Sequence, residues 1–149
     1  MNRLENRIPP PLVAVLFMLL SWLWDSDGTE SVTMQGAVAA VVIVAVLIAR
    51  ASITGFIRAK TTVNPLKPES ASTLVTTGIF GYSRNPMYVA LALLVFAFSL
   101  YFTGYWSLLF TVAYVLYITR FQISPEERAM EKLFGEEFVD YKGRVRRWL

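Results

Sequence analysis

The chain has 149 residues, of which 55% are hydrophobic and 17% are charged, and its formal net charge is +3. It contains no cysteine and no histidine, which excludes disulfides, thiol nucleophiles, zinc sites built from these residues and a Ser-His-Asp triad. Its carboxylates form no metal-ligand pattern, and its basic residues adjoin apolar segments. We therefore expect no bound metal and no nucleic-acid partner.

Four apolar segments follow one another along the chain. A helix that crosses a bilayer needs about 20 apolar residues, and shorter segments can extend into their flanking loops. The first segment resembles a secretory signal, but it ends in tryptophan and aspartate without a small-residue cleavage site, so we interpret it as a retained helix. The sequence predicts an all-α integral membrane protein, a single domain over residues 1–149, with four transmembrane helices at about 10–24, 35–57, 86–102 and 105–121.

The distribution of lysine and arginine predicts the orientation of these helices. Basic residues occur before the first helix, between the second and third, and after the fourth, whereas the other two connections lack them. Cytoplasmic loops of membrane proteins carry such an excess, so both termini are expected in the cytoplasm. Arg50 lies inside the second helix, where it can either extend toward the interface or face the bundle. The basic residues are Arg3 and Arg7, then Arg58, Lys60, Lys67 and Arg84, then Arg128, Lys132, Lys142, Arg144, Arg146 and Arg147.

Two long segments share the predicted cytoplasmic face. The loop at residues 58–83 is too long for a simple connection, and long loops in compact proteins are usually functional. The tail at 122–149 predicts amphipathic helices, with Ser124 as N-cap, Pro125 in the first turn and Glu127 completing a capping box. Gly135 is expected to divide the tail into two helices, whose apolar face lies along the membrane or over the loop.

Polar residues converge where the third and fourth predicted helices meet the cytoplasm. Arg84 and Asn85 precede the third helix, and Glu126 and Glu127 follow the fourth, so an antiparallel hairpin would bring them together under the tail. Each residue also has a simpler interpretation as a membrane anchor, a helix cap or a first-turn acid. The loop side of this predicted pocket consists of Thr76, Thr77, Gly78, Tyr82, Arg84, Asn85 and Tyr88.

Several of these motifs together resemble one family. The segments are "LVTTGIFGYSRNP" (74–86), "RNPMYVA" (84–90), "EER" (126–128) and "FGEEFVDYKGRVRRWL" (134–149). They resemble the isoprenylcysteine carboxyl methyltransferase and phospholipid methyltransferase superfamily, whose signature is R-H-P-x-Y-x-G, a hydrophobic span and E-E. The resemblance covers about half of the chain, from Thr61 to the end. Asn85 replaces the signature histidine and Ala90 replaces the signature glycine, and an amide cannot take up a proton at neutral pH.

The resemblance implies an integral-membrane enzyme that uses S-adenosylmethionine, with S-adenosylhomocysteine as product, and a cofactor pocket that opens to the cytoplasm. Arg84 would then hold the methionine carboxylate, and Glu126 or Glu127 the ammonium group. A carboxylate or thiol acceptor would need no base, whereas an amine would need one, with Glu127 as the local candidate. The catalytic residues implied are Arg84, Asn85 and Glu127, and the cofactor-binding residues are Thr77, Gly78, Phe80, Tyr82, Arg84, Asn85, Tyr88, Glu126 and Glu127.

The sequence and the resemblance together predict methyl transfer to a lipophilic small molecule or lipid that enters from the bilayer. We expect an inner-membrane protein of a bacterium or archaeon with its active site facing the cytoplasm. The sequence predicts neither the identity of the acceptor nor the oligomeric state. Two alternatives stay open: a nicotinamide-dependent membrane reductase of related fold, and a non-catalytic helical membrane protein that binds a partner or lipid through its basic tail.

Overall fold

The computed structural model of the protein describes residues 5, 7–25, 27–60, 72–103 and 106–149. Arg3, Lys67, Tyr105 and residues 61–71 of the predicted loop lie outside this part of the chain. The described residues form helices and no strands, which confirms the all-α fold class.

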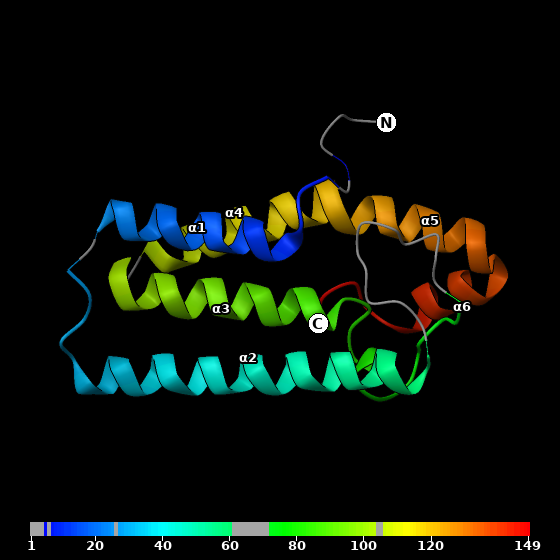
Figure 1. The fold of residues 1–149 in the computed structure, drawn as a ribbon, viewed down its shortest axis with the longest axis horizontal. Coiled ribbons are helices and arrows are strands. Elements are labelled where there is room, and N and C mark those ends of the chain that lie inside the picture. Colours follow the sequence, from blue (N-terminus) through cyan, green and yellow to red (C-terminus); the bar gives the residue numbers. More distant parts are fainter. Residues whose placement is uncertain (1–4, 6, 26, 61–71, 104–105) are drawn as a thin grey trace.

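Four apolar helices form the body of the protein. They are α1 (Pro10–Trp24), α2 (Val32–Arg58), α3 (Pro86–Thr103) and α4 (Ser107–Ile118), close to the predicted bounds. The helices lie side by side and alternate in direction (Figure 1). The start of α1, the end of α2, the start of α3 and the C-terminal helices therefore lie at the same end of the bundle.

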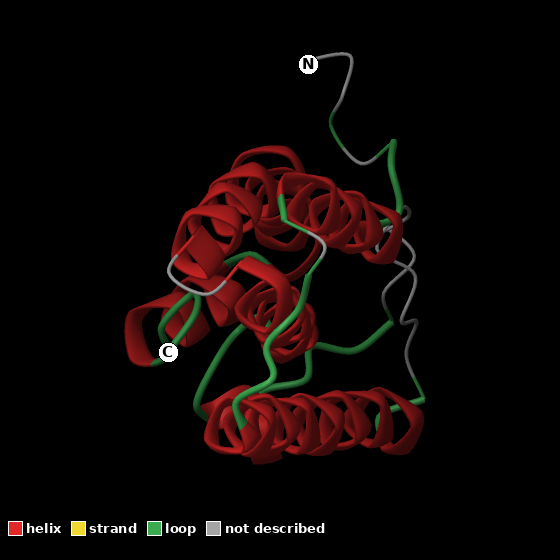
Figure 2. Cartoon of the chain, turned by 90° about the vertical axis from the view of Figure 1, so that its left-hand side faces the viewer, coloured by secondary structure: helices red, strands yellow, loops and turns green. Residues whose placement is uncertain are grey.

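The third helix is the centre of the bundle. α2 packs on one side of α3, while α1 and α4 pack on the other (Figures 1 and 2). The main apolar core lies between α1, α3 and α4 and includes Val13, Val95, Tyr114 and Ile118. In contrast, α2 buries only Ala45 and Ser52 completely, so most of its apolar surface faces outward.

Two helices are long and apolar enough to cross a membrane, as judged by length and composition. They are Val32–Arg58 and the continuous helix Ser107–Phe134, whereas α1 and α3 are apolar but shorter. A helix of 28 residues measures about 42 Å, more than the hydrocarbon core of about 30 Å. All charged residues of Ser107–Phe134 lie from Arg120 onward. If this helix crosses a membrane, its last part, which carries Glu126 and Glu127, lies outside the hydrocarbon.

The fourth helix does not end where the sequence predicted. α4 continues through η4, a π-helical turn at Thr119–Ile123, directly into α5 (Ser124–Phe134). The predicted N-cap and capping box at Ser124 are therefore wrong, and the Ser124 hydroxyl donates to the Thr119 carbonyl at 2.7 Å. The physical reason is Pro125, which offers no N–H to the carbonyl four residues earlier, and a wider turn accommodates it without ending the helix.

The C-terminal tail folds back over the loop that precedes α3. Gly135, with a φ of 55°, separates α5 from α6 (Glu136–Arg144), as predicted. Phe138, Tyr141 and Val145 form a small core to which Leu74 of the loop contributes. The Tyr141 hydroxyl donates to the Phe80 carbonyl at 2.7 Å. Of the two predicted positions for the apolar face of the tail, the structure has the one over the loop.

A short 3₁₀ helix in the loop, η2 (Gly78–Gly81), attaches it to α2. Phe80 is buried, and its ring lies 4.9 Å from the ring of Phe56, centroid to centroid, in an edge-on arrangement. A methyl group at Gly55 would come within 2.9 Å of the Phe80 ring. Gly55 therefore allows the loop to approach α2 closely.

This contact predicts opposite effects for two glycines of α2. Alanine favours a helix over glycine by about 0.5–1 kcal/mol, so Gly36→Ala, which meets no atom within 4 Å, should stabilise the protein. Gly55→Ala should instead be the less stable of the two variants by about 1–3 kcal/mol, because its methyl group overpacks Phe80. Thermal unfolding in detergent measures the difference, and equal melting temperatures would contradict the packing of Phe80 on α2.

Candidate functional site

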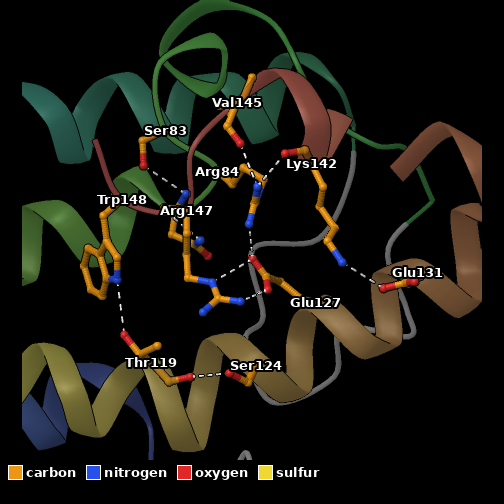
Figure 3. A network of polar contacts seen from close by, with 11 residues as sticks. Ser83, Arg84, Thr119, Ser124, Glu127, Glu131, Lys142, Val145, Arg147 and Trp148 are labelled. Carbon is orange, nitrogen blue, oxygen red and sulfur yellow. Dashed lines mark hydrogen bonds and ion pairs between the residues drawn. The ribbon is translucent and has the colours of Figure 1, made fainter. Parts of the chain in front are cut away.

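One carboxylate, that of Glu127, joins three segments of the chain. Arg84, just before α3, donates from Nη2 to Glu127 Oε1 at 2.7 Å. Arg147, near the C-terminus, donates from Nε to Oε1 at 3.1 Å and from Nη2 to Oε2 at 2.5 Å (Figure 3). The side chains of Arg84 and Glu127 are each 10% exposed, whereas Arg147 is 38% exposed and covers them from outside.

The remaining donors of Arg84 face the end of α6. Its Nη1 donates to the carbonyls of Lys142 at 3.1 Å and Val145 at 2.6 Å, and its backbone N–H donates to the Arg146 carbonyl at 2.9 Å. Carbonyls at the C-terminal end of a helix lack partners within the helix and attract cations. The Nε of Arg84 is buried and has no partner among the described residues.

Asn85 holds the segment that ends the chain. Its Nδ2 donates to the Arg147 carbonyl at 2.9 Å, and its backbone N–H donates to the Ser83 hydroxyl at 3.1 Å. Trp148 donates from Nε1 to the Thr119 hydroxyl at 3.2 Å (Figure 3). Residues 145–148, called the C-terminal segment from here on, are therefore fixed between the start of α3 and the η4–α5 part of the long helix.

Glu126 faces a different group of side chains from its neighbour Glu127. The Tyr88 hydroxyl donates to Glu126 Oε1 at 2.5 Å, and Gln122 Nε2 donates to the same oxygen at 2.7 Å. The second oxygen, Oε2, has no hydrogen-bond donor among the described residues. Consecutive residues of a helix point about 100° apart, which separates the two carboxylates.

These surroundings give the two carboxyl groups opposite pKa shifts. Burial alone would raise the pKa of Glu127, but the hydrogen bonds and charges of Arg147 and Arg84 outweigh it and hold that pKa below its ordinary value. Burial raises the pKa of Glu126 to about 7, although the hydrogen bonds from Tyr88 and Gln122 oppose the shift. Glu127 is thus a stable anion, whereas Glu126 can exchange a proton near neutral pH.

The structure brings together part of the predicted site. Arg84, Asn85 and Glu127 share one hydrogen-bonded network, and Tyr88 and Glu126 contact each other beside it. Phe80 instead packs on α2. Thr77, Gly78 and Tyr82 are exposed and make no hydrogen bond or ion pair with these side chains in the described structure.

Sequence reasoning missed two members of the site, Arg147 and Gln122. The sequence identifies Arg147 only as one of several basic residues of the tail, together with Arg144 and Arg146. The path of the C-terminal segment brings the Arg147 side chain, and not that of Arg144 or Arg146, to Glu127. The spacing of the three arginines in the sequence does not predict this path. The sequence predicts Gln122 only as the first residue of the amphipathic tail. In the structure it donates to Glu126 Oε1 from η4 and is almost completely buried.

The arrangement is suited to binding a small zwitterion. A buried guanidinium nitrogen without a partner, Arg84 Nε, can bind a carboxylate. Glu127 Oε2 accepts a single hydrogen bond, so it can accept another from an ammonium donor. Within the described part of the chain, no group of three or more carboxylates could hold a metal ion.

Comparisons with known proteins identify the family of the chain. A family model described as phospholipid methyltransferase matches residues 32–137. The chain is also similar to a protein of Haemophilus influenzae described as uncharacterized, with 40% identity over 63 residues, which are 42% of this chain and the whole of that relative. No solved structure matches the chain.

The buried ion pair predicts a large stability effect at Glu127. Glu127→Gln leaves the Arg84 charge buried without its counter-ion, and breaking such a pair costs about 3–5 kcal/mol. Glu131→Gln, on the same helix, removes the exposed pair with Lys142 and should cost less than about 1 kcal/mol. Thermal unfolding in detergent compares the two variants, and similar losses would contradict the burial of the Arg84–Glu127 pair.

The raised pKa of Glu126 predicts that the stability of the protein decreases with rising pH. The folded protein binds this proton more tightly than the unfolded chain, so stability should fall as the pH rises from about 4.5 to about 7. Glu126→Gln should remove this decline, because the amide carries no titratable proton. Melting temperatures measured across this pH range provide the test, and an unchanged decline in the variant would refute the assignment.

Proposed function

Because the chain belongs to the phospholipid methyltransferase family, we propose that it transfers a methyl group from S-adenosylmethionine to a lipophilic or membrane-resident acceptor. The family match also confirms the resemblance seen in the sequence. Membership implies a methyltransferase that acts on a membrane substrate. The cofactor, the kind of acceptor and the roles of individual residues are proposed from the geometry below.

The single observation that carries the cofactor proposal is the unpartnered Nε of Arg84. A charged donor that is buried without an acceptor is costly, and a carboxylate ligand would satisfy it. The methionine part of S-adenosylmethionine has a carboxylate for Arg84 and an ammonium group for Glu127, so these residues fit it. When bound, the cofactor supplies a methyl group on a positively charged sulfur.

Glu127 serves in this proposal as an anion and not as a base. Its two arginine partners hold its pKa low, which makes it a poor proton acceptor. The same negative charge attracts the ammonium group. Asn85 cannot exchange a proton, and its bond to the Arg147 carbonyl gives it the role of fixing the C-terminal segment over the site.

The proposed membrane arrangement has four spans with both termini and the site in the cytoplasm. Two helices are long enough to span, and α1 and α3 are apolar and lie parallel to them (Figure 1). The end of the bundle that carries Arg84, Glu127 and Arg147 is also rich in basic residues, which supports a cytoplasmic position of an inner membrane. The cofactor would then arrive from the cytoplasm and the acceptor from the bilayer.

Ligand binding tests this proposal directly. Isothermal titration calorimetry on detergent-purified protein should detect S-adenosylhomocysteine, and Arg84→Lys should weaken its binding at least about tenfold. Lysine keeps the charge but loses the forked donors that bind a carboxylate. Arg144→Lys is the matched control, because Arg144 is exposed and its Nε contacts only the Asp140 carbonyl of its own helix.

The same measurement separates the alternatives. Binding of NADPH in place of S-adenosylhomocysteine would favour a reductase, and binding of neither would favour a non-catalytic protein. Equal loss of affinity in the Arg84 and Arg144 variants would place the cofactor elsewhere.

A further inference from the structure

One polar group in the middle of the bundle has no role in the cofactor site. Tyr114 of α4 is completely buried, with 0% of its surface exposed, and its hydroxyl has no hydrogen-bond partner among the described residues. Leaving such a group unpaired costs about 1–3 kcal/mol. Phenylalanine would fill the same space without this cost, so a ligand that pairs with the hydroxyl would explain the tyrosine.

The unpaired hydroxyl lies close to the Glu126 group. Tyr114 and Tyr88 belong to the same packed core cluster, and their hydroxyls are near enough to interact electrostatically. Tyr88 and Gln122 in turn bind Glu126 Oε1, which leaves Oε2 without a donor. A row of polar groups therefore runs from the interior of the bundle to the face of α5 next to the proposed cofactor site.

We propose that Tyr114, Tyr88, Gln122 and Glu126 bind the polar head of the methyl acceptor, and that this head donates hydrogen bonds through N–H or O–H. The inference rests on the proposed function and adds the class of acceptor to it. It also gives the two adjacent glutamates different roles: Glu127 binds the cofactor and Glu126 binds the acceptor.

Two atoms without hydrogen-bond partners among the described residues, Glu126 Oε2 and the Tyr114 hydroxyl oxygen, determine which class of head group can bind. Glu126 Oε2 can only accept a hydrogen bond when it is ionised, and the Tyr114 hydroxyl can accept or donate one. The guanidinium groups of Arg84 and Arg147 are bound to Glu127. Those of Arg120 and Arg128, on the same long helix as Glu126, are bound to Glu5. A carboxylate head would meet the negative charge of Glu126 without a free cation to compensate it, whereas an ammonium or hydroxyl head would be complementary.

Glu126 can also act as the acceptor for the proton that such a head group loses. As the nitrogen or oxygen of the head forms its bond to the methyl carbon, the carbon–sulfur bond breaks and the sulfur keeps the electron pair. An ammonium head has no lone pair, so it must first give one proton to the ionised Glu126 Oε2 before the neutral amine attacks the carbon. A hydroxyl head gives its proton to the same oxygen as its bond to the carbon forms. A pKa of about 7 suits a group that accepts a proton and releases it again near neutral pH.

Phe17 of α1 packs against the ring of Tyr114. The ring of Phe17 lies edge-on to the ring of Tyr114 with the centroids 5.8 Å apart, and Phe17 is partly exposed on the outside of the bundle. Phe17 is thus the side chain between the lipid-facing surface and the buried hydroxyl. An acceptor with a long apolar part could leave that part in the bilayer while its head passes between α1 and α4.

Tyr114→Phe tests the proposal, because stability and function should change in opposite directions. Removing an unpaired buried hydroxyl should leave the melting temperature equal or higher, and S-adenosylhomocysteine binding should not change. Methyl transfer should lose about tenfold in kcat/KM, mainly through KM of the acceptor, because a hydrogen bond to the head is lost. Tyr117→Phe removes a hydroxyl at the edge of the same cluster and should behave as wild type in all three measurements.

Three acceptors presented with labelled S-adenosylmethionine distinguish the head groups. They are vesicles of phosphatidylethanolamine, which carry ammonium heads, vesicles of phosphatidylglycerol, which carry hydroxyl heads, and farnesylcysteine in detergent, whose carboxylate is the alternative. Transfer to one of the vesicle lipids that falls in Tyr114→Phe supports the proposal. Preference for farnesylcysteine, no transfer to any of the three, or a Tyr114→Phe variant equal to wild type overturns it. If S-adenosylhomocysteine does not bind the wild type, the proposed function itself fails.

Discussion

The architecture of the end of the bundle that carries the C-terminal helices depends on the carboxylate of Glu127. Its partners lie 43 residues earlier, at Arg84, and 20 residues later, at Arg147, so a single side chain connects the start of α3, the middle of α5 and the C-terminal segment. Two arginines around one carboxylate leave a local net charge of +1. A buried group of this kind is favourable only when its hydrogen bonds are satisfied. Arg84 meets this condition in part, because its Nη1 uses the free carbonyls at the end of α6 while its Nε has no partner among the described residues. The folded position of the tail therefore depends on the same hydrogen bonds and ion pairs that set the charge of the site.

Most of the fold could be predicted from the sequence, because long apolar runs determine where the apolar helices lie. The bounds of α1 and the division of the tail at Gly135 follow from local patterns alone. The convergence of Arg84 with Glu127 also followed, since an antiparallel hairpin returns the chain to the same end. The predicted helix start at Ser124 was wrong. Ser124, Pro125 and Glu127 have the spacing of a capped helix start, and the same spacing also fits a continuous helix with a π turn. Local sequence cannot separate these two cases, because Pro125 is compatible with a helix start and with a π turn. The continuous helix buries Gln122 and Ile123, which local sequence does not reveal.

The residues of the C-terminal segment illustrate a second limit. Three arginines close together in the sequence, Arg144, Arg146 and Arg147, differ in the structure because the chain leaves α6 in an extended conformation at Val145. Extended backbone points successive side chains to opposite sides, so Arg147 faces Glu127 while Arg146 remains exposed and contributes only its carbonyl. Composition predicts a basic tail, but only the backbone path decides which charge reaches the site.

The π turn also has a consequence for the proposed chemistry. A helix that ended at residue 121 would place both glutamates in the first turn of a separate helix. The continuous helix instead fixes them on the same rigid element as α4, with about 100° between their directions. One carboxylate then lies among arginines and the other among tyrosines and glutamine, and their pKa values separate for that reason. On the proposed function, the two substrates of the reaction meet on either side of this doublet. The irregular turn that accommodates Pro125 thus also sets the relative position of the donor and the acceptor of the methyl group.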